Sequence, residues 1–354
     1  MITVTESLAV QPVNPLQYPN WDTRISSSRG HSIFQSSAWA AVLQNTYGFK
    51  PVYFTVFRGK ELQGFLPTME VSSWLTGKRG VCLPFTDYCQ GAASSEGLLQ
   101  QLFQEALRYG RSKNWKYLEI RGGRGIPELH DSGPRSIGFF GHRLSLVPGL
   151  EKIFGDLEGR ARNAIRKAEK SGVLTETSQT FNAVREYYSL HCKTRKKHGL
   201  PPQSFKFFSN IHRHIISQDL GTVVSAKFKG RIIASGIYFS NGDEAIHKFG
   251  ASDLAFQDLR ANNLVMWEAI KWCAAKGCKV LELGRTSLTN EGLRRYKLGW
   301  GTEEYVIDYF RYDLANKRLI SLKDEAYGWH NRVFGALPIW VTRLIGAAIY
   351  RHVA

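Results

Sequence analysis

The alternation of hydrophobic and polar positions predicts a β-hairpin in each half of the chain. The paired strands are expected at residues 52–57 with 62–66 and at residues 222–228 with 231–239. Their turns, Arg58-Gly59-Lys60 and Lys229-Gly230, each contain a glycine, for which a positive φ costs little. Gly64 and Gly236 lie inside the second strands, where a glycine often marks a bulge or a close backbone approach.

Each half then continues with an amphipathic helix and a short strand. The first pair is expected at residues 96–113 and 115–121, and the second at residues 262–276 and 278–284. The two strands align as KYLEI against KVLEL. Because the elements recur in the same order, we infer an internal duplication of a mixed α/β unit rather than chance similarity of short apolar strings.

The boundary between the halves is expected at Pro148-Gly149, after a glycine- and proline-rich stretch. We therefore predict domains at residues 1–148 and 149–316 and a C-terminal helical tail at residues 317–354. Arg343 interrupts the apolar run of this tail, which is shorter than the roughly 18 or more residues that a spanning helix needs. The tail is expected either to dock on its own domain or to lie on an anionic membrane surface.

The segment 160–170 predicts a helix with two distinct faces. Its apolar stripe comprises Ala161, Ile165 and Ala168, and its basic stripe comprises Arg162, Arg166 and Lys170. A solvated basic face is the ordinary interpretation. Like charges stacked one turn apart repel, however, and Arg162 lies near the positive end of the helix dipole. These two costs favour contact with a phosphate or another anion.

The segment 262–301 carries the strongest functional pattern. A helix leads into a strand that ends at Gly284-Arg285, and a basic, glycine-punctuated segment follows at residues 292–301. Open α/β sheets bind ligands at the C-terminal ends of strands, which is where Arg285 lies. Lys297 stands before a Gly-Trp-Gly turn and could neutralise a phosphate or polarise a carbonyl. A surface cation near a helix end is an equal interpretation on spacing alone.

Composition narrows the classes of function. The chain has 354 residues, 47 Lys and Arg against 30 Asp and Glu, and a net charge of +17. This charge favours polyanionic neighbours, namely nucleic acid, anionic lipid or phosphorylated precursors, although solubility alone could account for part of it. The five cysteines match no zinc spacing and predict free thiols in a reducing cytoplasm, and residues 1–15 show no signal-peptide pattern. Gly-x-Ser-x-Gly, HExxH and P-loop motifs are absent, which removes support for serine nucleophiles, zinc hydrolysis and NTP hydrolysis.

Several segments together resemble the Fem-type aminoacyltransferases, which are built as tandem GNAT-like domains, and related GNAT-fold acyltransferases. The matching segments are 31–39, 64–67 and 83–88 in the first half, and 162–173, 198–201, 247–252, 263–268, 284–285 and 292–301 in the second. The last segment, GLRRYKLGWG, is the most specific. The resemblance covers most of residues 30–315 and implies an α/β fold of mixed sheets in two tandem GNAT-like acyltransferase domains.

The same resemblance implies transfer of an acyl or aminoacyl group to an amine by direct attack, without a metal or a covalent enzyme intermediate. The implied donor co-substrate is an aminoacyl-tRNA or an acyl-CoA, and no cofactor is bound permanently. The acceptor would be a phosphorylated or lipid-linked envelope precursor, such as a peptidoglycan precursor, or an exopolysaccharide amine. The enzyme would act in the cytoplasm, with peripheral contact at the inner face of the membrane through its tail.

The resemblance also implies roles for particular residues. Lys297 and Arg285 are expected to be catalytic. The expected substrate-binding residues are Arg162, Arg166, Lys248, Asn263, Glu291, Arg295 and Trp300. The second half has no Arg/Gln-x-x-Gly-x-Gly/Ala turn of the kind that holds the CoA pyrophosphate, so both donors stay open. The alternative is a non-catalytic basic protein that binds RNA or an anionic membrane surface.

Overall fold

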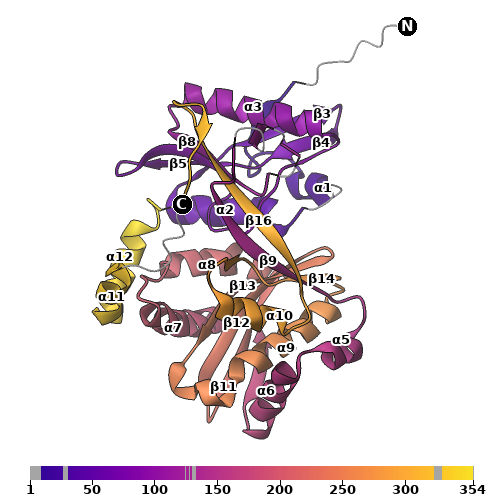
Figure 1. The fold of residues 1–354 in the computed structure, drawn as a ribbon, viewed down its shortest axis with the longest axis vertical. Helices are drawn as coiled ribbons and strands as arrows, with labels where there is room; N and C mark the ends of the chain where they lie inside the picture. Colours follow the sequence, from indigo (N-terminus) through magenta and orange to yellow (C-terminus); the bar gives the residue numbers. More distant parts are fainter. Residues whose placement is uncertain are drawn as a thin grey trace. The chain divides into compact units, whose positions relative to one another are not determined.

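The computed structural model describes residues 9–26, 31–123, 125–126, 128–129, 133–322 and 329–353. The chain forms two compact units. Unit 1 comprises Met1–Gly138, Ile307–Lys323 and Arg351–Ala354, and unit 2 comprises Phe139–Val306 and Asp324–Tyr350. The chain passes between the units within strands β9 (Ile137–Ser145) and β16 (Glu303–Asp313), so Pro148-Gly149 lies inside unit 2 (Figure 1). Residues 1–8 of the amino-terminal segment lie outside the described residues.

Unit 1 contains two sets of strands. One has the order β1 (Gln11–Val13), β3 (Tyr53–Arg58), β4 (Glu61–Leu66) and β7 (Ala92–Ala93). The other has the order β8 (Tyr117–Arg121), β6 (Gly77–Val81), β5 (Met69–Ser73) and β2 (Lys50–Pro51), with the later part of β16 on β8 and β17 (Arg318–Leu319) on β16. Its helices are α1 (Trp21–Ser26), α2 (Ser37–Tyr47) and α3 (Glu96–Ser112), with a 3-10 turn at Ile33–Gln35.

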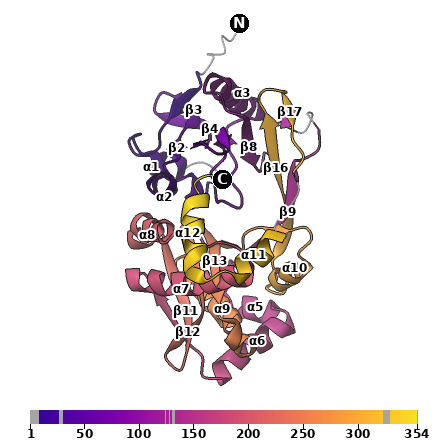
Figure 2. The same cartoon turned by 90° about the vertical axis from the view of Figure 1, so that its left-hand side faces the viewer.

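Unit 2 is built on the strand order β10 (Leu174–Ser178), β11 (Gly221–Phe228), β12 (Arg231–Asn241), β13 (Glu244–Ser252), β14 (Val280–Glu282) and β9, with β15 (Thr286–Ser287) also paired to β9. Its helices are α5 (Leu150–Asp156), α6 (Gly159–Lys170), α7 (Phe181–Lys197), α8 (Phe205–His214), α9 (Ala261–Ala275), α10 (Glu291–Leu298), α11 (Trp329–Ala336) and α12 (Ile339–Ile349). Short 3-10 segments lie at Ile216–Gln218 and Leu254–Leu259. Figure 2 shows the same elements from a second direction.

Both predicted hairpins are confirmed. β3 pairs with β4, and β11 pairs with β12. Lys229 and Gly230 adopt φ values of 49° and 77°, the left-handed conformations that a tight turn between twisted strands requires. Gly64 lies beside a register shift in its hairpin, and a Cβ there would stand 2.9 Å from Ala93 Cβ. Glycine is therefore needed where β7 approaches β4.

The inferred duplication is also visible in the fold. In unit 1, α3 connects the parallel strands β6 and β8, and in unit 2, α9 connects the parallel strands β13 and β14. α9 packs against β11 and β12 of its own sheet, whereas α3 packs mainly against β3 and β4 and less against β8. The halves differ in their hairpins, because β3 and β4 belong to a separate set of strands whereas β11 and β12 continue into β13.

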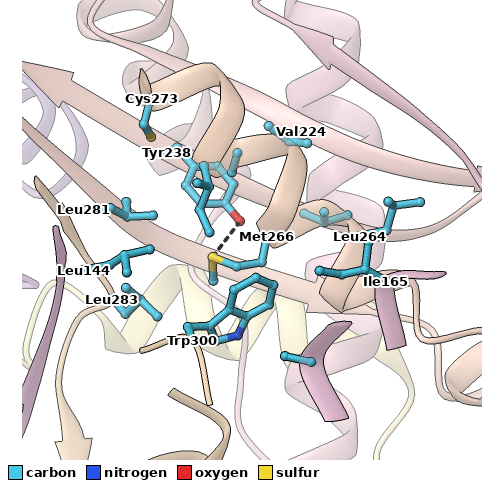
Figure 3. Packing of buried hydrophobic residues seen from close by; sticks show 14 of the residues in the cluster. Leu144, Ile165, Val224, Tyr238, Leu264, Met266, Cys273, Leu281, Leu283 and Trp300 are labelled. Atoms are coloured by element: carbon cyan, nitrogen blue, oxygen red, sulfur yellow. Dashed lines mark hydrogen bonds between the residues drawn. The ribbon is translucent and has the colours of Figure 1, made fainter. Parts of the chain in front are cut away.

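The hydrophobic core of unit 2 lies between its sheet and helices α6 and α9. The predicted apolar stripe of α6 is buried there, with Ile165 only 1% exposed. Figure 3 shows Tyr238, Met266 and Trp300 at the centre of this core, where the Tyr238 hydroxyl donates to the Met266 sulfur at 4.0 Å. Trp300 is 1% exposed, so its indole packs within the core.

The C-terminal tail docks on unit 2. α11 and α12 pack against α7, and Gly346 approaches so closely that a Cβ there would stand 1.9 Å from the Pro202 carbonyl oxygen. Tyr350 accepts a hydrogen bond from Arg195 at 2.7 Å and donates one to the Pro201 carbonyl at 3.0 Å. Within the described ranges, no helix combines the length and apolar character needed to cross a membrane.

Replacing the central indole tests this account of the core. We expect Trp300→Ala to lower the free energy of unfolding by about 3–5 kcal/mol, because it removes a large buried side chain and leaves a cavity. Urea denaturation followed by circular dichroism measures the change. Unchanged stability would show that Trp300 does not anchor the core.

Candidate functional site

Strands β13 and β14 pair over a short distance and then separate. Their parallel ladder comprises the pairs Glu244 with Val280, Ala245 with Leu281 and Ile246 with Glu282. β13 continues to Ser252 on β12. The chain after Glu282 stays on β9, with which β14 already pairs, and the Leu283 amide donates to the His142 carbonyl at 2.9 Å. We call this divergence beyond Ile246 and Glu282 the fork. Ligands of open α/β sheets bind where neighbouring parallel strands part in this way.

Lys297 binds the backbone segment that follows β14 at the fork. Its Nζ donates to the carbonyl oxygens of Gly284 and Arg285 at 2.7 and 3.1 Å, and the residue is only 5% exposed. Helix α10 presents this side chain to the fork, and Asn290 caps the helix by accepting from the Leu293 amide at 3.0 Å. A buried ammonium group must donate its protons to compensate for lost water. The geometry therefore gives Lys297 a positioning role at the end of β14.

A histidine and an ion pair lie beside Lys297. His142 is fully buried, and burial together with the Lys297 charge lowers its pKa to about 4, so the imidazole is neutral at pH 7. His142 Nε2 lies 3.1 Å from Glu304 Oε2, although this contact is poorly aligned for a hydrogen bond. Arg294 holds Glu304 with two bonds of 2.8 and 2.9 Å and keeps the pKa of that carboxyl below its usual range. Arg294 also pairs with Glu291 at 3.6 Å, so the two cations of the cluster are matched by two carboxylates.

Two consecutive phenylalanines of β9 support the arginines of this region. The Arg285 guanidinium lies 4.3 Å from the centroid of the Phe139 ring, and that of Arg294 lies 4.4 Å from the Phe140 ring. Stacking on an aromatic ring restrains a guanidinium without consuming its N–H donors. Arg285 is exposed, so its head group stands at the solvent side of the fork on the backbone segment that Lys297 holds.

A carboxylate pair lies on the paired side of the fork, and the sequence analysis missed it. Glu282 is 8% exposed and accepts hydrogen bonds from Arg143 at 2.6 Å and from the Tyr305 hydroxyl at 2.9 Å. Glu244 stands two residues before Ile246, the partner of Glu282, and so projects from the same face of the sheet. Burial and then the Glu282 charge raise the pKa of Glu244 to about 8, and burial also raises the pKa of Glu282. The pair can therefore hold or accept a proton near neutral pH.

The duplicated strands offered a signal for Glu282. It aligns with Glu119 in KYLEI against KVLEL, and Glu119 is likewise buried. Glu119 is bound by Arg121 at 2.9 Å and by Arg311 at 2.6 Å. These charges outweigh the effect of burial and hold the pKa of Glu119 below its usual range, whereas the pKa of Glu282 is raised.

The position beside this glutamate differs in charge between the units. Glu119 pairs with Val81, and Arg79 stands two residues before Val81, as Glu244 stands two residues before Ile246. Unit 1 therefore has a cation where unit 2 has a second carboxylate. Arg121 and Arg311 lower the pKa of Glu119, whereas burial raises the pKa of both unit 2 carboxylates and the Glu282 charge adds to the rise at Glu244.

The other residues predicted for substrate binding lie on four elements of unit 2. On α6, Arg162 donates to the Gly155 carbonyl, and the exposed Arg166 stacks 5.7 Å from the Phe154 ring. The remaining residues are Lys248 on β13, Asn263 in the first turn of α9, and the exposed Glu291 and Arg295 on α10. α6 begins beside the turn after α10, because the Glu158 amide donates to the Gly299 carbonyl at 3.0 Å.

The loop that enters α9 contains no glycine between Asp253 and Arg260. Asp253 holds it by accepting bonds from Lys193 at 3.1 Å, Arg231 at 2.7 Å and the Ala255 amide at 3.2 Å. α9 starts after Arg260, whose φ is 57°, without a side-chain cap. Within the described part of the chain, no group of three or more histidine, cysteine, aspartate or glutamate side chains is arranged to hold a metal ion.

Comparison with known proteins identifies the fold of both units. Residues 157–306 match the family model described as the acetyltransferase (GNAT) domain. The structure of FemX matches with a TM-score of 0.68 and 14% identity over 87% of this chain and 98% of FemX. A tandem GNAT protein from the clavulanic acid biosynthesis pathway matches with a TM-score of 0.55 and 10% identity over 87% of this chain and 98% of its own. L-PGS from Bacillus licheniformis matches with a TM-score of 0.52 and 13% identity over 92% of this chain and 96% of its own.

These matches confirm the expected mixed α/β fold with tandem GNAT-like domains and the resemblance to Fem-type proteins. Among curated proteins, no significant match to the sequence is found. The segment that matches the GNAT domain model, residues 157–306, contains the fork, α6, α9 and α10.

Replacing Lys297 tests its positioning role. We expect Lys297→Met to lower the free energy of unfolding by about 1–3 kcal/mol, because the Gly284 and Arg285 carbonyls lose a buried donor. Arg295→Met on the exposed side of the same helix is the control and should change stability by less than about 0.5 kcal/mol. Equal stability of the two variants in chemical denaturation would contradict the assignment.

The carboxylate pair predicts how stability depends on pH. The folded-state pKa of Glu244, about 8, lies above its ordinary value of 4.5, so the folded state binds the proton more tightly. This stabilisation is complete below about pH 4.5 and is lost as pH rises through about 8. We expect the free energy of unfolding to fall less in Glu244→Gln than in the wild type as pH rises between these values. The difference should be on the order of 1 kcal/mol or more. Parallel denaturation curves across this range measure it, and identical pH dependence of the two proteins would refute the raised pKa.

Proposed function

We propose that this GNAT-type acyltransferase transfers an acyl or aminoacyl group to an amine of a cell-envelope precursor or polysaccharide, and that the fork of unit 2 is its active site. The observation that carries the proposal is the arrangement of opposite charges on the two sides of the fork. Lys297 and Arg285 lie on the segment after β14, and the carboxylates of Glu244 and Glu282 lie on the paired strands before it. Attack of an amine on a carbonyl needs both kinds of group.

In the proposed reaction the acceptor amine attacks the donor carbonyl carbon directly. A C–N bond forms, and the bond to the carrier sulfur or oxygen then breaks. Arg285 stabilises the negative charge that develops on the carbonyl oxygen, and Lys297 holds the Arg285 backbone while adding its own positive charge. The proton released by the amine passes to the Glu244 and Glu282 pair, whose raised pKa values suit a proton acceptor near neutral pH. The carrier leaves with a proton from solvent.

The donor is proposed to be an aminoacyl-tRNA or an acyl-CoA, which share a phosphate-bearing carrier. The net charge of +17 and the basic stripe of α6 support phosphate contact, with Arg162 and Arg166 as its residues. The uncapped amino terminus of α9, near Asn263, presents backbone N–H groups that suit the same charge. Lys248, Glu291 and Arg295 complete the proposed substrate-binding set, and Trp300, buried in the core, is proposed to support it by packing.

The acceptor is proposed to be a phosphorylated or lipid-linked envelope precursor, with a peptidoglycan precursor and an exopolysaccharide amine as the two alternatives. Its phosphate charge would complement the net charge of +17 of the chain. We place the enzyme in the cytoplasm, at the inner face of the membrane, where such precursors are assembled. Contact with that membrane is proposed to run through the C-terminal tail.

A transfer assay distinguishes these possibilities. Purified full-length protein is incubated with labelled aminoacyl-tRNA or acetyl-CoA and a panel of envelope amines, and the labelled amide product is separated by mass. We expect product from one donor class only. Salt-sensitive binding of RNA or anionic vesicles without any product from either donor would instead favour the non-catalytic basic protein.

Arg285 offers a sharper test, because its side chain is exposed and its loss should not disturb the core. We expect Arg285→Gln to lower kcat/KM by about 100-fold, as loss of one group that stabilises a developing oxyanion does. Arg185→Gln is the matched control, since Arg185 also stacks on a phenylalanine, 5.5 Å from the Phe181 ring, outside the proposed site. Equal activity of the two variants in the transfer assay would place the reaction elsewhere.

A further inference from the structure

The outer face of α12 is apolar and exposed although the helix is docked. Trp340 and Leu344 are 66% and 65% exposed, and they stand one turn apart. On the opposite side of the helix, Thr342 is 1% exposed and Gly346 is in close contact with Pro202. Docking on α7 and exposure of a large apolar surface are therefore properties of different faces of one helix.

The neighbourhood of this face is basic. Residues 329–353 contain no aspartate or glutamate. Arg332 on α11 and Arg343 on α12 are exposed. The carboxyl end of α7 adds Lys196 and Lys197 beside α11, since Asn331 Nδ2 donates to the His198 carbonyl at 2.9 Å. Exposed apolar side chains on a surface helix, with cations on that helix and on its neighbours and Arg343 stacked 5.4 Å from the Tyr188 ring, match the chemistry of an anionic bilayer interface.

We propose that the outer face of α12, centred on Trp340 and Leu344, binds the surface of an anionic lipid bilayer while the helix stays docked on unit 2. Trp340 would enter the interfacial layer, where indole rings are stable, and Leu344 would reach the acyl chains. Pairing of this face with a second copy of the chain is disfavoured, because a two-fold interface would bring Arg332 and Arg343 toward their own counterparts. The inference deepens the membrane contact proposed above for the C-terminal tail, but it concerns a surface separate from the fork and can be tested without the transfer reaction.

Co-sedimentation of the full-length protein with vesicles tests the proposal. We expect binding to vesicles of phosphatidylcholine containing about one quarter phosphatidylglycerol, weaker binding to phosphatidylcholine alone, and a loss of affinity as salt is raised. Leu344→Glu should weaken binding at least about tenfold. The substitution removes a leucine that would be buried in the bilayer and adds a negative charge that the anionic lipid repels. Leu174→Glu is the matched control, since Leu174 is 72% exposed on β10, and it should bind as the wild type does.

A second variant, Trp340→Ser, removes the other large apolar side chain of this face and should also weaken binding. Circular dichroism verifies that each variant is folded. Wild-type protein that does not sediment with anionic vesicles would overturn the proposal. So would equal losses in Leu344→Glu and Leu174→Glu. A wild-type dimer that Leu344→Glu converts to a monomer, with vesicle binding unchanged, would assign the face to chain–chain contact instead.

Discussion

The short parallel ladder between β13 and β14 governs the organisation of unit 2. A parallel pair requires a crossover, and α9 supplies it while burying one face in the core that also holds Trp300. The ladder ends after Ile246 and Glu282, so the backbone of the following residues must find other partners. Lys297 provides them by donating to two consecutive carbonyls. The core, the fork and the candidate site are thus consequences of one pairing.

Duplication of the fold did not duplicate the chemistry. Both units have a buried glutamate on the strand that follows the crossover helix, and each glutamate pairs with an arginine. In unit 1 two arginines stabilise its ionised form, and Arg79 occupies the adjacent position. In unit 2 Glu244 takes that position, and the pKa values rise. The carboxylate of unit 1 thus has two arginine partners that keep it ionised, whereas burial raises the pKa values of the unit 2 pair.

The C-terminal helices show how one helix can meet two requirements. Gly346 allows α12 to approach the Pro202 carbonyl, and Tyr350 ties the end of the helix to Arg195 and Pro201. The face of α12 that docks on unit 2 thus uses small and hydrogen-bonding residues. Its large apolar residues lie on the exposed face. Docking and lipid contact, which the sequence presented as alternatives, are physically compatible because they use opposite sides of α12.

Local patterns in the sequence determined the hairpins, the helix and strand that follow each hairpin, and the two faces of α6. These features depend on side-chain periodicity and turn chemistry within short segments. The sequence also marked Lys297 and Arg285, but it could not separate a surface cation from a buried one. Only the tertiary structure decided that Lys297 is buried on two carbonyls and that Glu244 stands beside Glu282, because both depend on which strands pair and in what register. Charge, burial and pKa arise from neighbours that are distant in sequence, so the chemistry of this site emerged only with the fold.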